Sequence, residues 1–178
     1  MKVIDISFKL DEQTQIYEGD PRFCMEVWRS IEQDTYMLSK LKMGTHTGTH
    51  IDAPCHYIEG AKTIYDVPME TFIGACKVVD RLDQIQEGDE RVIIKGKNAL
   101  TPEEARELVK KRVRLVGTER LSVGGDDVHR ILLGNECVIL ERLKLHKVKT
   151  GSYMLCAPPL KIEADGCPVR ACLIEGVL

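Results

Sequence analysis

The sequence has few aromatic residues and no strong excess of charge of either sign. Aromatic residues make up 5% of its 178 positions, with a single tryptophan, Trp28, and the formal net charge is -3. So small a charge gives no electrostatic surface for a nucleic acid or a membrane, and we expect neither as a partner. The scarcity of aromatic side chains also leaves no evident stacking pocket for a large aromatic ligand.

Long apolar runs and paired cysteine motifs are missing too. No stretch approaches the roughly 20 apolar residues of a membrane-spanning helix, and the first residues lack the apolar region of a secretion signal. The cysteines number seven and none has the Cys-x-x-Cys spacing, which favours reduced thiols over a disulfide framework. We therefore expect a cytoplasmic protein, and the length and 43% hydrophobic content predict one domain, residues 1–178.

Histidine is concentrated in one short stretch, Met-Gly-Thr-His-Thr-Gly-Thr-His-Ile-Asp-Ala-Pro-Cys-His, residues 43–56. In an extended chain, every second side chain points to the same face. A strand here would line up His46, His50, Asp52 and His56, and Gly48 would leave space for a cation between two imidazoles. A helix could align the first two histidines, but the glycines and the proline oppose it.

Imidazole nitrogens and a carboxylate oxygen suit Zn²⁺, with Mn²⁺ or Fe²⁺ as alternatives where carboxylates are added. The competing interpretation is a polar strand whose histidines are only hydrogen-bonded, and the clustering favours the metal site. Cys55 beside His56 is a weaker candidate, as a nucleophile, because neighbours in an extended chain face opposite ways.

Apolar patterning predicts an α/β protein with more strand than helix. Thr101-Pro-Glu-Glu is typical of a helix start, with a threonine cap and Glu104 completing a capping box. The strand–helix–strand order around this helix suggests some parallel pairing. Asp165-Gly-Cys-Pro is expected to form a turn between the last two strands. The expected strands are 2–7, 22–29, 34–43, 75–79, 92–95, 113–116, 137–140, 152–162 and 169–174, and the helices are 101–111 and 126–133.

Two further candidate ligands lie later in the chain. His129 falls one turn into the second expected helix, and Glu141 follows a buried strand directly. Ligands often collect at the C-terminal ends of such strands, but Glu141 is equally well explained as the first exposed residue after one. His146 lies in a basic loop and is expected to be exposed.

The motif His-x-Gly-Thr-His-x-Asp-x-Pro-x-His, from His46 to His56, resembles the signature of the bacterial-type kynurenine formamidase family, also called the cyclase family of metal-dependent hydrolases. Further stretches resemble family landmarks, so the resemblance spans nearly the whole chain. They are Asp5-Ile-Ser, Tyr17-Glu-Gly-Asp-Pro, Pro159-Leu-Lys-Ile and Asp165-Gly-Cys-Pro-Val-Arg. The resemblance implies a swivelling β/β/α fold.

The resemblance also implies a site with two ions, Zn²⁺ first and Mn²⁺ as the alternative. One ion would take His46, His50 and Asp52, and the other His129 and Glu141, with Asp52 as a possible bridge. His56 would either bind the second ion or act as the general acid/base, and His56 or Glu141 would protonate the departing amine.

The implied reaction is that of an arylformamidase of tryptophan catabolism, from N-formylkynurenine to kynurenine and formate, in a homodimer or homotetramer. The alternatives are ring opening of a cyclic amide such as isatin, a metal-binding homologue without turnover, and a lyase or cyclase. Three departures from the family pattern put the substrate in question. Glu18 replaces a usual proline, Glu119 replaces a usual aspartate, and the loop Gly96–Leu100 is short.

Overall fold

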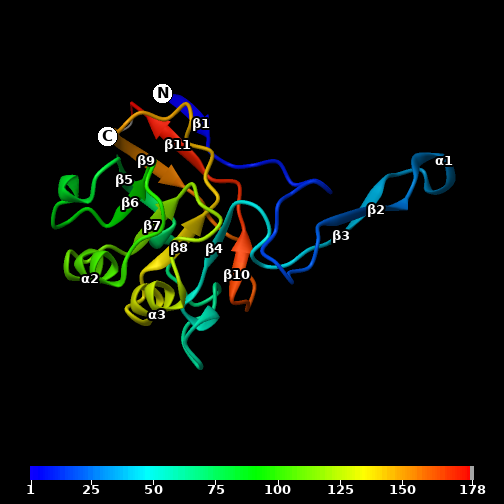
Figure 1. Ribbon diagram of the computed structural model, residues 1–178. Helices are drawn as coiled ribbons and strands as arrows, with labels where there is room; N and C mark the ends of the chain where they lie inside the picture. The colour runs from blue at the N-terminus through cyan, green and yellow to red at the C-terminus, as the bar shows by residue number, and fades with distance from the viewer. Residues whose placement is uncertain (177–178) are drawn as a thin grey trace.

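The computed structural model describes residues 1–176, in which a curled nine-stranded sheet carries two helices (Figure 1). The sheet order is β1-β11-β9-β5-β6-β7-β8-β4-β10, and β2 and β3 form a separate two-stranded sheet. The strands are β1 (Lys2–Asp5), β2 (Cys24–Arg29), β3 (Leu38–Lys42), β4 (His50–Asp52), β5 (Ile73–Val79), β6 (Arg91–Ile94), β7 (Leu115–Thr118), β8 (Val138–Glu141), β9 (Gly151–Cys156), β10 (Gly166–Pro168) and β11 (Cys172–Glu175). The helices are α1 (Ile31–Asp34), α2 (Pro102–Lys110) and α3 (Asp126–Gly134), with short 3₁₀ turns at Pro54–His56, Met69–Thr71 and Leu82–Gln84.

The middle of the sheet is parallel, from β5 through β6 and β7 to β8, and the outer pairings are antiparallel. The expected parallel pairing is therefore confirmed, as is the excess of strand over helix. Helix α2 begins as predicted. The Glu104 N–H donates to Thr101 Oγ1 at 3.3 Å, and the Thr101 N–H donates to the Glu104 side chain at 2.9 Å. Two orphan backbone donors are thus satisfied at the helix start.

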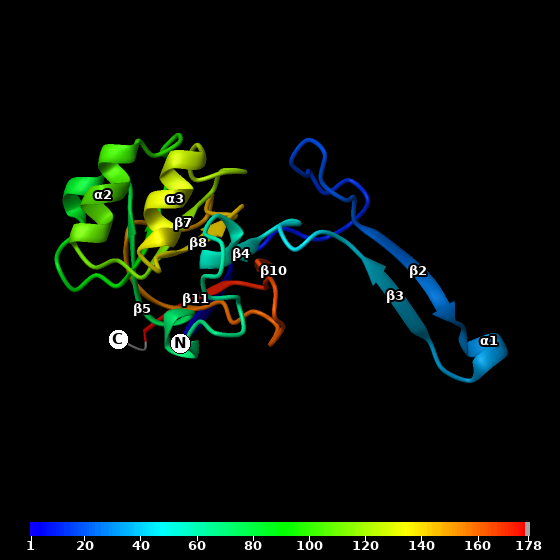
Figure 2. The same cartoon turned by 90° about the horizontal axis from the view of Figure 1, so that it is seen from below.

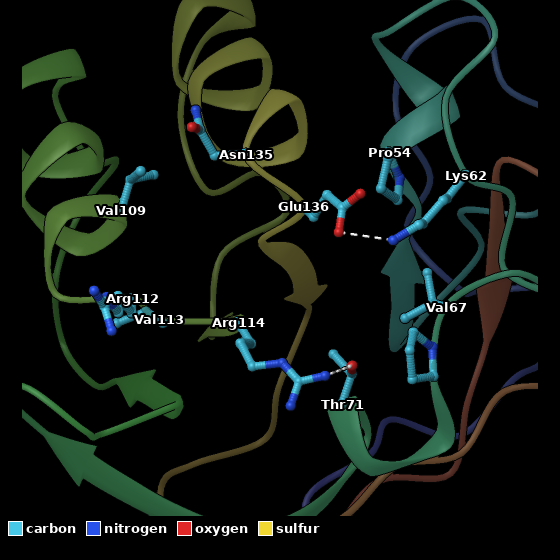
Figure 3. A pocket seen from close by; sticks show the side chains of 11 residues that line it. Pro54, Lys62, Val67, Thr71, Val109, Arg112, Val113, Arg114, Asn135 and Glu136 are labelled. Atoms are coloured by element: carbon cyan, nitrogen blue, oxygen red, sulfur yellow. Dashed lines mark hydrogen bonds and ion pairs between the residues drawn. The ribbon is translucent and has the colours of Figure 1, made fainter.

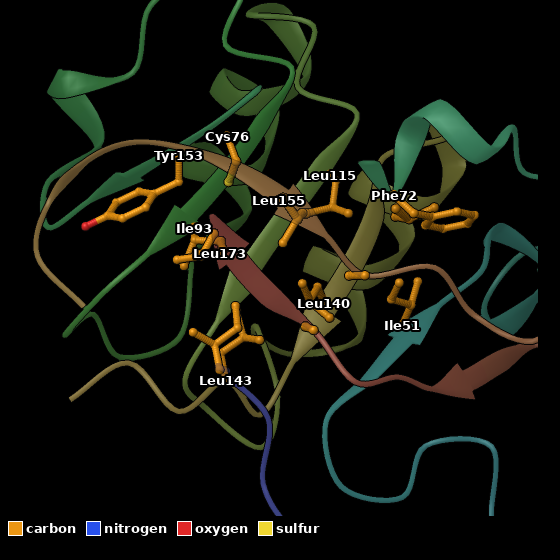
Figure 4. Close-up of a cluster of buried hydrophobic side chains, with 14 of the residues drawn as sticks. Ile51, Phe72, Cys76, Ile93, Leu115, Leu140, Leu143, Tyr153, Leu155 and Leu173 are labelled. Atoms are coloured by element: carbon orange, nitrogen blue, oxygen red, sulfur yellow. The ribbon is translucent and has the colours of Figure 1, made fainter. Parts of the chain in front are cut away.

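Two hydrophobic clusters hold the sheet between them. The smaller cluster packs α2 and α3 on one face, through side chains such as Leu108, Leu132 and Ile139. The larger cluster fills the inside of the curl, with Phe72, Leu140 and Leu155 among its fully buried members (Figure 4). Strand β8 contributes to both because its alternate side chains face opposite sides of the sheet. Its last residue, Glu141, is thereby held rigidly in the interior.

The β2–β3 hairpin projects away from the rest of the molecule as an arm (Figures 1 and 2). All six residues of β2 are exposed, including Trp28 at 60%. Three segments differ from expectation. Residues 34–37 form the end of α1 and its turn instead of strand, residues 157–162 follow β9 outside any strand, and residues 166–168 form strand β10 instead of a turn. Among the described residues, no helix has the length and apolar character needed to cross a membrane.

Candidate metal centre and active site

Strand β4 brings the middle of the histidine stretch into the sheet. It pairs with β8 on one side and with β10 on the other, so that His50 lies opposite Glu141 and Asp52 lies opposite Gly166. Both pairings are antiparallel and put directly opposed side chains within about 5 Å at Cβ. Glu141 and Gly166, which follow β4 by about 90 and 115 positions in sequence, therefore lie on either side of its three residues.

The rest of the stretch is bent, which corrects the expectation of one extended strand from residue 43 to 56. Gly48 has φ +70°, a backbone conformation that side chains disfavour, and the chain turns there before β4 begins. The space at Gly48 holds no cation, because an added Cβ would lie 2.4 Å from Leu10 Cδ2. A second bend follows at Pro54–His56. The two bends stack the His46 and His56 rings, with centroids 4.0 Å apart.

Asp52 lies at the centre of the cluster and is buried. Its Oδ1 is 2.7 Å from His46 Nδ1 and 3.2 Å from His50 Nε2. Its Oδ2 is 3.8 Å from His129 Nε2. The two oxygens of this carboxylate thus face different imidazoles, an arrangement that allows one side chain to bridge two ions.

Glu141 and His129 close the other side of the cluster. Glu141 Oε1 is 3.5 Å from His129 Nε2, and its Oε2 is 3.7 Å from His50 Nε2. The Val123 backbone N–H donates to Glu141 Oε1 at 2.6 Å and fixes the carboxylate. The alternative interpretation of Glu141 as the first exposed residue after a strand is wrong, because it is the last residue of β8 and is buried.

Two of the imidazoles are oriented by backbone carbonyls. His50 Nδ1 lies 2.8 Å from the Gly48 carbonyl oxygen, and His129 Nδ1 lies 3.1 Å from that of Gly125, one helical turn earlier. A carbonyl only accepts, so each Nδ1 carries the proton and donates it. Each Nε2 faces the buried carboxylates, so that it can donate to them when protonated and offer its lone pair to a metal when neutral, as histidines that bind metals do.

Charge in the cluster is balanced by shared protons. Burial alone would raise the pKa of Asp52, but hydrogen bonds from His46 and His50 hold it far below its usual range. Burial opposes the charged form of His46, yet its bonds to Asp52 and Asp165 raise its pKa to about 9. Burial, and then the charge of Asp52, raise the pKa of Glu141. Asp52 and Glu141 are buried close together, so positive charge must lie beside them to offset the cost of burying two carboxylates.

His56 has a different environment. Its side chain is 28% exposed, and burial, followed by repulsion from His46, lowers its pKa. A neutral imidazole at the edge of the cluster can accept a proton near pH 7.

The cluster opens into a cavity of about 230 Å³. Tyr17 and Tyr57 lie in its wall, so aromatic side chains border the site although the sequence has few of them. The Tyr57 ring stacks on His129 with centroids 4.7 Å apart, and its hydroxyl donates to Asp126 at 3.0 Å. No spacing rule in the sequence connects these tyrosines with the histidines. His146, expected to be exposed, is exposed.

Asp165 is the site residue that the sequence patterns missed. Its Oδ2 is 2.9 Å from His46 Nε2 and 3.4 Å from His56 Nδ1. The available signals were its place in Asp165-Gly-Cys-Pro, where a turn is expected, and the resemblance of Asp165-Gly-Cys-Pro-Val-Arg to a family landmark, and neither assigns it to the histidine cluster. The pairing of β10 with β4 brings this carboxylate to the histidines, and a short strand with a proline does not reveal its partner.

A larger cavity, of about 380 Å³, lies at the C-terminal ends of α2 and α3 and is basic in character (Figure 3). Lys62 pairs with Glu136 at 2.7 Å, and Arg114 donates to Thr71 Oγ1 at 3.1 Å. Glu136 is the one acidic side chain among the described residues that line it, so this cavity offers no donor set for a metal.

The donor set of the first cavity fits a divalent metal. Ligand atoms of His46, Asp52 and His56 lie within 4.8 Å of one another, and so do those of His50, Asp52 and Glu141. Imidazole nitrogens and carboxylate oxygens are ligands of Zn²⁺ and Mn²⁺. A cation would also supply the positive charge that the buried carboxylates require.

Known proteins resemble this chain in sequence and in fold. The model of the Cyclase family matches residues 4–98 of this chain. The kynurenine formamidase of Bacillus cereus is 33% identical over 198 residues, which cover 94% of this chain and 95% of that protein. A solved structure described as a potential metal-dependent hydrolase with cyclase activity is 30% identical, with a TM-score of 0.81 over 97% of this chain and 96% of its own.

A more distant structure shares the fold. Isatin hydrolase A from Labrenzia aggregata has a TM-score of 0.84 at 22% identity, over 98% of this chain and 94% of that one. The fold expected from the histidine motif is therefore confirmed. With a family model covering more than half of its residues and a relative matched over nearly full length, the chain belongs to the cyclase family of metal-dependent hydrolases.

Proposed function

We propose that the chain hydrolyses a small amide with the help of two divalent ions, and that N-formylkynurenine is its substrate. The products would be kynurenine and formate, with one water consumed. The observation that carries this proposal is the position of Asp52, whose two oxygens face separate imidazoles inside a cavity. The 33% identity to a kynurenine formamidase over nearly the whole chain supports the choice of substrate.

The distances between the side chains support the proposed ion set. His46, His50 and Asp52 Oδ1 would hold one ion, and His129, Glu141 and Asp52 Oδ2 the other, with Zn²⁺ as the first metal and Mn²⁺ as the alternative. Ions in such a site polarise a carbonyl and lower the pKa of water towards about 7. The Val123 N–H, which donates to Glu141 Oε1, would orient this carboxylate towards the ion.

We propose His56 as the side chain that moves protons. It is neutral near pH 7 because its pKa is lowered, and it borders the cavity. It would take a proton from the attacking water and give it to the departing aryl amine. Tyr17 and Tyr57 would flank the aromatic ring of the substrate. The alternative role, with His56 as a metal ligand, rests on its grouping with His46 and Asp52.

A substrate panel with two histidine variants tests the proposal. Zinc- and manganese-loaded protein is assayed on N-formylkynurenine, formanilide and isatin. We expect turnover of N-formylkynurenine, and a fall in kcat of roughly 10²–10⁴-fold in His56→Ala with the metal content unchanged. His146→Ala, at an exposed position, is the matched control and should retain full activity.

The other outcomes are distinct. Loss of metal in His56→Ala would assign that side chain as a ligand. Turnover of isatin alone would identify a ring-opening hydrolase of cyclic amides. Metal binding without turnover of any amide would refute the proposed activity and favour a binding protein, or a lyase or cyclase acting on other carbonyl compounds.

We also propose that the chain self-associates, as a homodimer or homotetramer, through the β2–β3 arm. A two-stranded hairpin is marginally stable alone in water, yet Met25, Val27 and Leu41 share one exposed apolar face of this one. A second copy of the arm or of the body would cover that face.

Leu41→Glu should lower the molar mass measured by light scattering. Leu38→Glu is the matched control, because it makes the same substitution on the opposite face of the same strand. A wild-type protein that is monomeric at all concentrations would refute the proposal.

A further inference from the structure

Asp165 is fixed to the metal-binding strand by its backbone. Its carbonyl oxygen accepts the Ala53 N–H at 2.8 Å, and strand β10 begins at the next residue, with Gly166 opposite Asp52. The position of the carboxylate is therefore set by the sheet, although 44% of its side chain is exposed. This explains how a surface aspartate is placed repeatably against buried histidines.

The carboxylate is shared among three side chains of the site. Oδ2 is 2.9 Å from His46 Nε2 and 3.4 Å from His56 Nδ1, and Oδ1 accepts the Thr45 hydroxyl at 3.0 Å. His46 and His56 are the two stacked rings, so a single oxygen faces one nitrogen of each.

An ionised carboxylate only accepts hydrogen bonds, so both His46 nitrogens donate in the metal-free site, Nδ1 to Asp52 Oδ1 at 2.7 Å and Nε2 to Asp165 Oδ2. A cation held beside the buried Asp52 would replace the proton on Nδ1, and Asp165 would keep the proton on Nε2. His50 and His129 are oriented the other way, with Nδ1 on a backbone carbonyl and Nε2 facing the centre.

We propose that Asp165 is a positioning residue, which holds His46 as an Nδ1 ligand of the metal and orients His56 for proton transfer. The inference rests on the proposed metal centre. The Asp165 carboxylate gives His46 a charged hydrogen-bond acceptor, whereas His50 and His129 have neutral backbone carbonyls as acceptors. Such partners behind a ligand histidine fix its tautomer and raise its basicity, and their loss typically weakens metal binding about 10–100-fold.

Gly166 supports the same arrangement. A Cβ at this position would lie 2.5 Å from His46 Cε1 and 2.8 Å from the Ile51 carbonyl oxygen. The His46 ring therefore sits directly against the backbone beside Asp165, where only glycine leaves room. Gly166→Ala should displace the ring and weaken metal binding without removing any charge.

Zinc affinity measures this role directly. Apo protein competes with a chromogenic chelator for Zn²⁺ in the wild type, Asp165→Ala and Asp165→Asn. We expect about 10–100-fold weaker binding for the alanine variant and a smaller loss for asparagine, whose amide oxygen still accepts from His46. Asp66→Asn is the control, because it removes a nearby charge whose hydrogen bonds go to Thr63. Wild-type affinity in Asp165→Ala would overturn the inference.

Ring ¹⁵N spectra of the zinc-loaded wild type give a second measurement that needs no variant to fold. The proposed role of Asp165 predicts that the His46 ring is protonated at Nε2 and binds zinc through Nδ1. Zinc binding through Nε2 would contradict the inference. A wild type that binds no zinc at all would instead refute the proposed function, on which this inference depends.

Discussion

Raising the pH should destabilise the metal-free protein, because His46 then loses a proton that the fold holds tightly. Its pKa is about 9 in the folded protein, against 6.5 for an unperturbed histidine. A folded pKa above the unfolded one contributes stability that is fully present below pH 6.5 and is lost as the pH rises through about 9. His50 and His129, whose pKa values are also raised, act in the same direction.

The size of the effect follows from the two pKa values. At about 1.4 kcal/mol for each pKa unit, the difference corresponds to about 3 kcal/mol of unfolding free energy. The His46 side chain is only 18% exposed, so solvent screens its interactions with Asp52 and Asp165 weakly. Single domains have about 5–15 kcal/mol in total, so the loss is a substantial fraction.

Urea unfolding of chelator-treated protein between pH 6 and 9 measures this loss. Far-UV circular dichroism is the suitable signal, since the one tryptophan lies on the exposed arm. His46→Gln should reduce the dependence on pH, and His146→Gln should leave it unchanged. Zinc-loaded protein should not show the decline, because the cation replaces the proton. A free energy of unfolding that is constant from pH 6.5 to 9 in the metal-free protein would refute the reasoning.

Three further changes test the site and the core. Glu141→Ala should lose about one metal ion per chain by elemental analysis while His146→Ala keeps the wild-type content; unchanged metal in the former would remove Glu141 from the centre. Gly48→Ala should lower the free energy of unfolding by roughly 1–3 kcal/mol, since its φ of +70° and the Leu10 side chain both oppose a Cβ; a neutral effect in urea unfolding would contradict that. Leu140→Ala, at a fully buried position, should cost about 2–5 kcal/mol, and a smaller loss would mean that the core collapses around the gap.

Local chemistry explains which parts of the fold could be predicted. The start of α2 depends on Thr101 and Glu104, three residues apart, and both hydrogen bonds form as the pattern indicates. The bend at Gly48 was missed because alternation of residue types says nothing about φ. The position of Asp165 was missed because it depends on β10 pairing with β4, a contact between segments more than 110 residues apart. Long-range pairing is not encoded in any short window.

The buried charges of the cluster link metal binding to proton release. Asp52 and Glu141 are both buried and share His50 and His129 as neighbours, so an uncompensated pair of negative charges would be strongly unfavourable. Protons on the imidazoles, above all on His46, supply that charge in the metal-free state. Metal binding then exchanges protons for cations, and its affinity should rise with pH as the competition weakens. Calorimetric titration of zinc at pH 7 in buffers of different ionisation enthalpy should detect at least one proton released, and a titration that releases none would show that His46 is already neutral before the metal arrives.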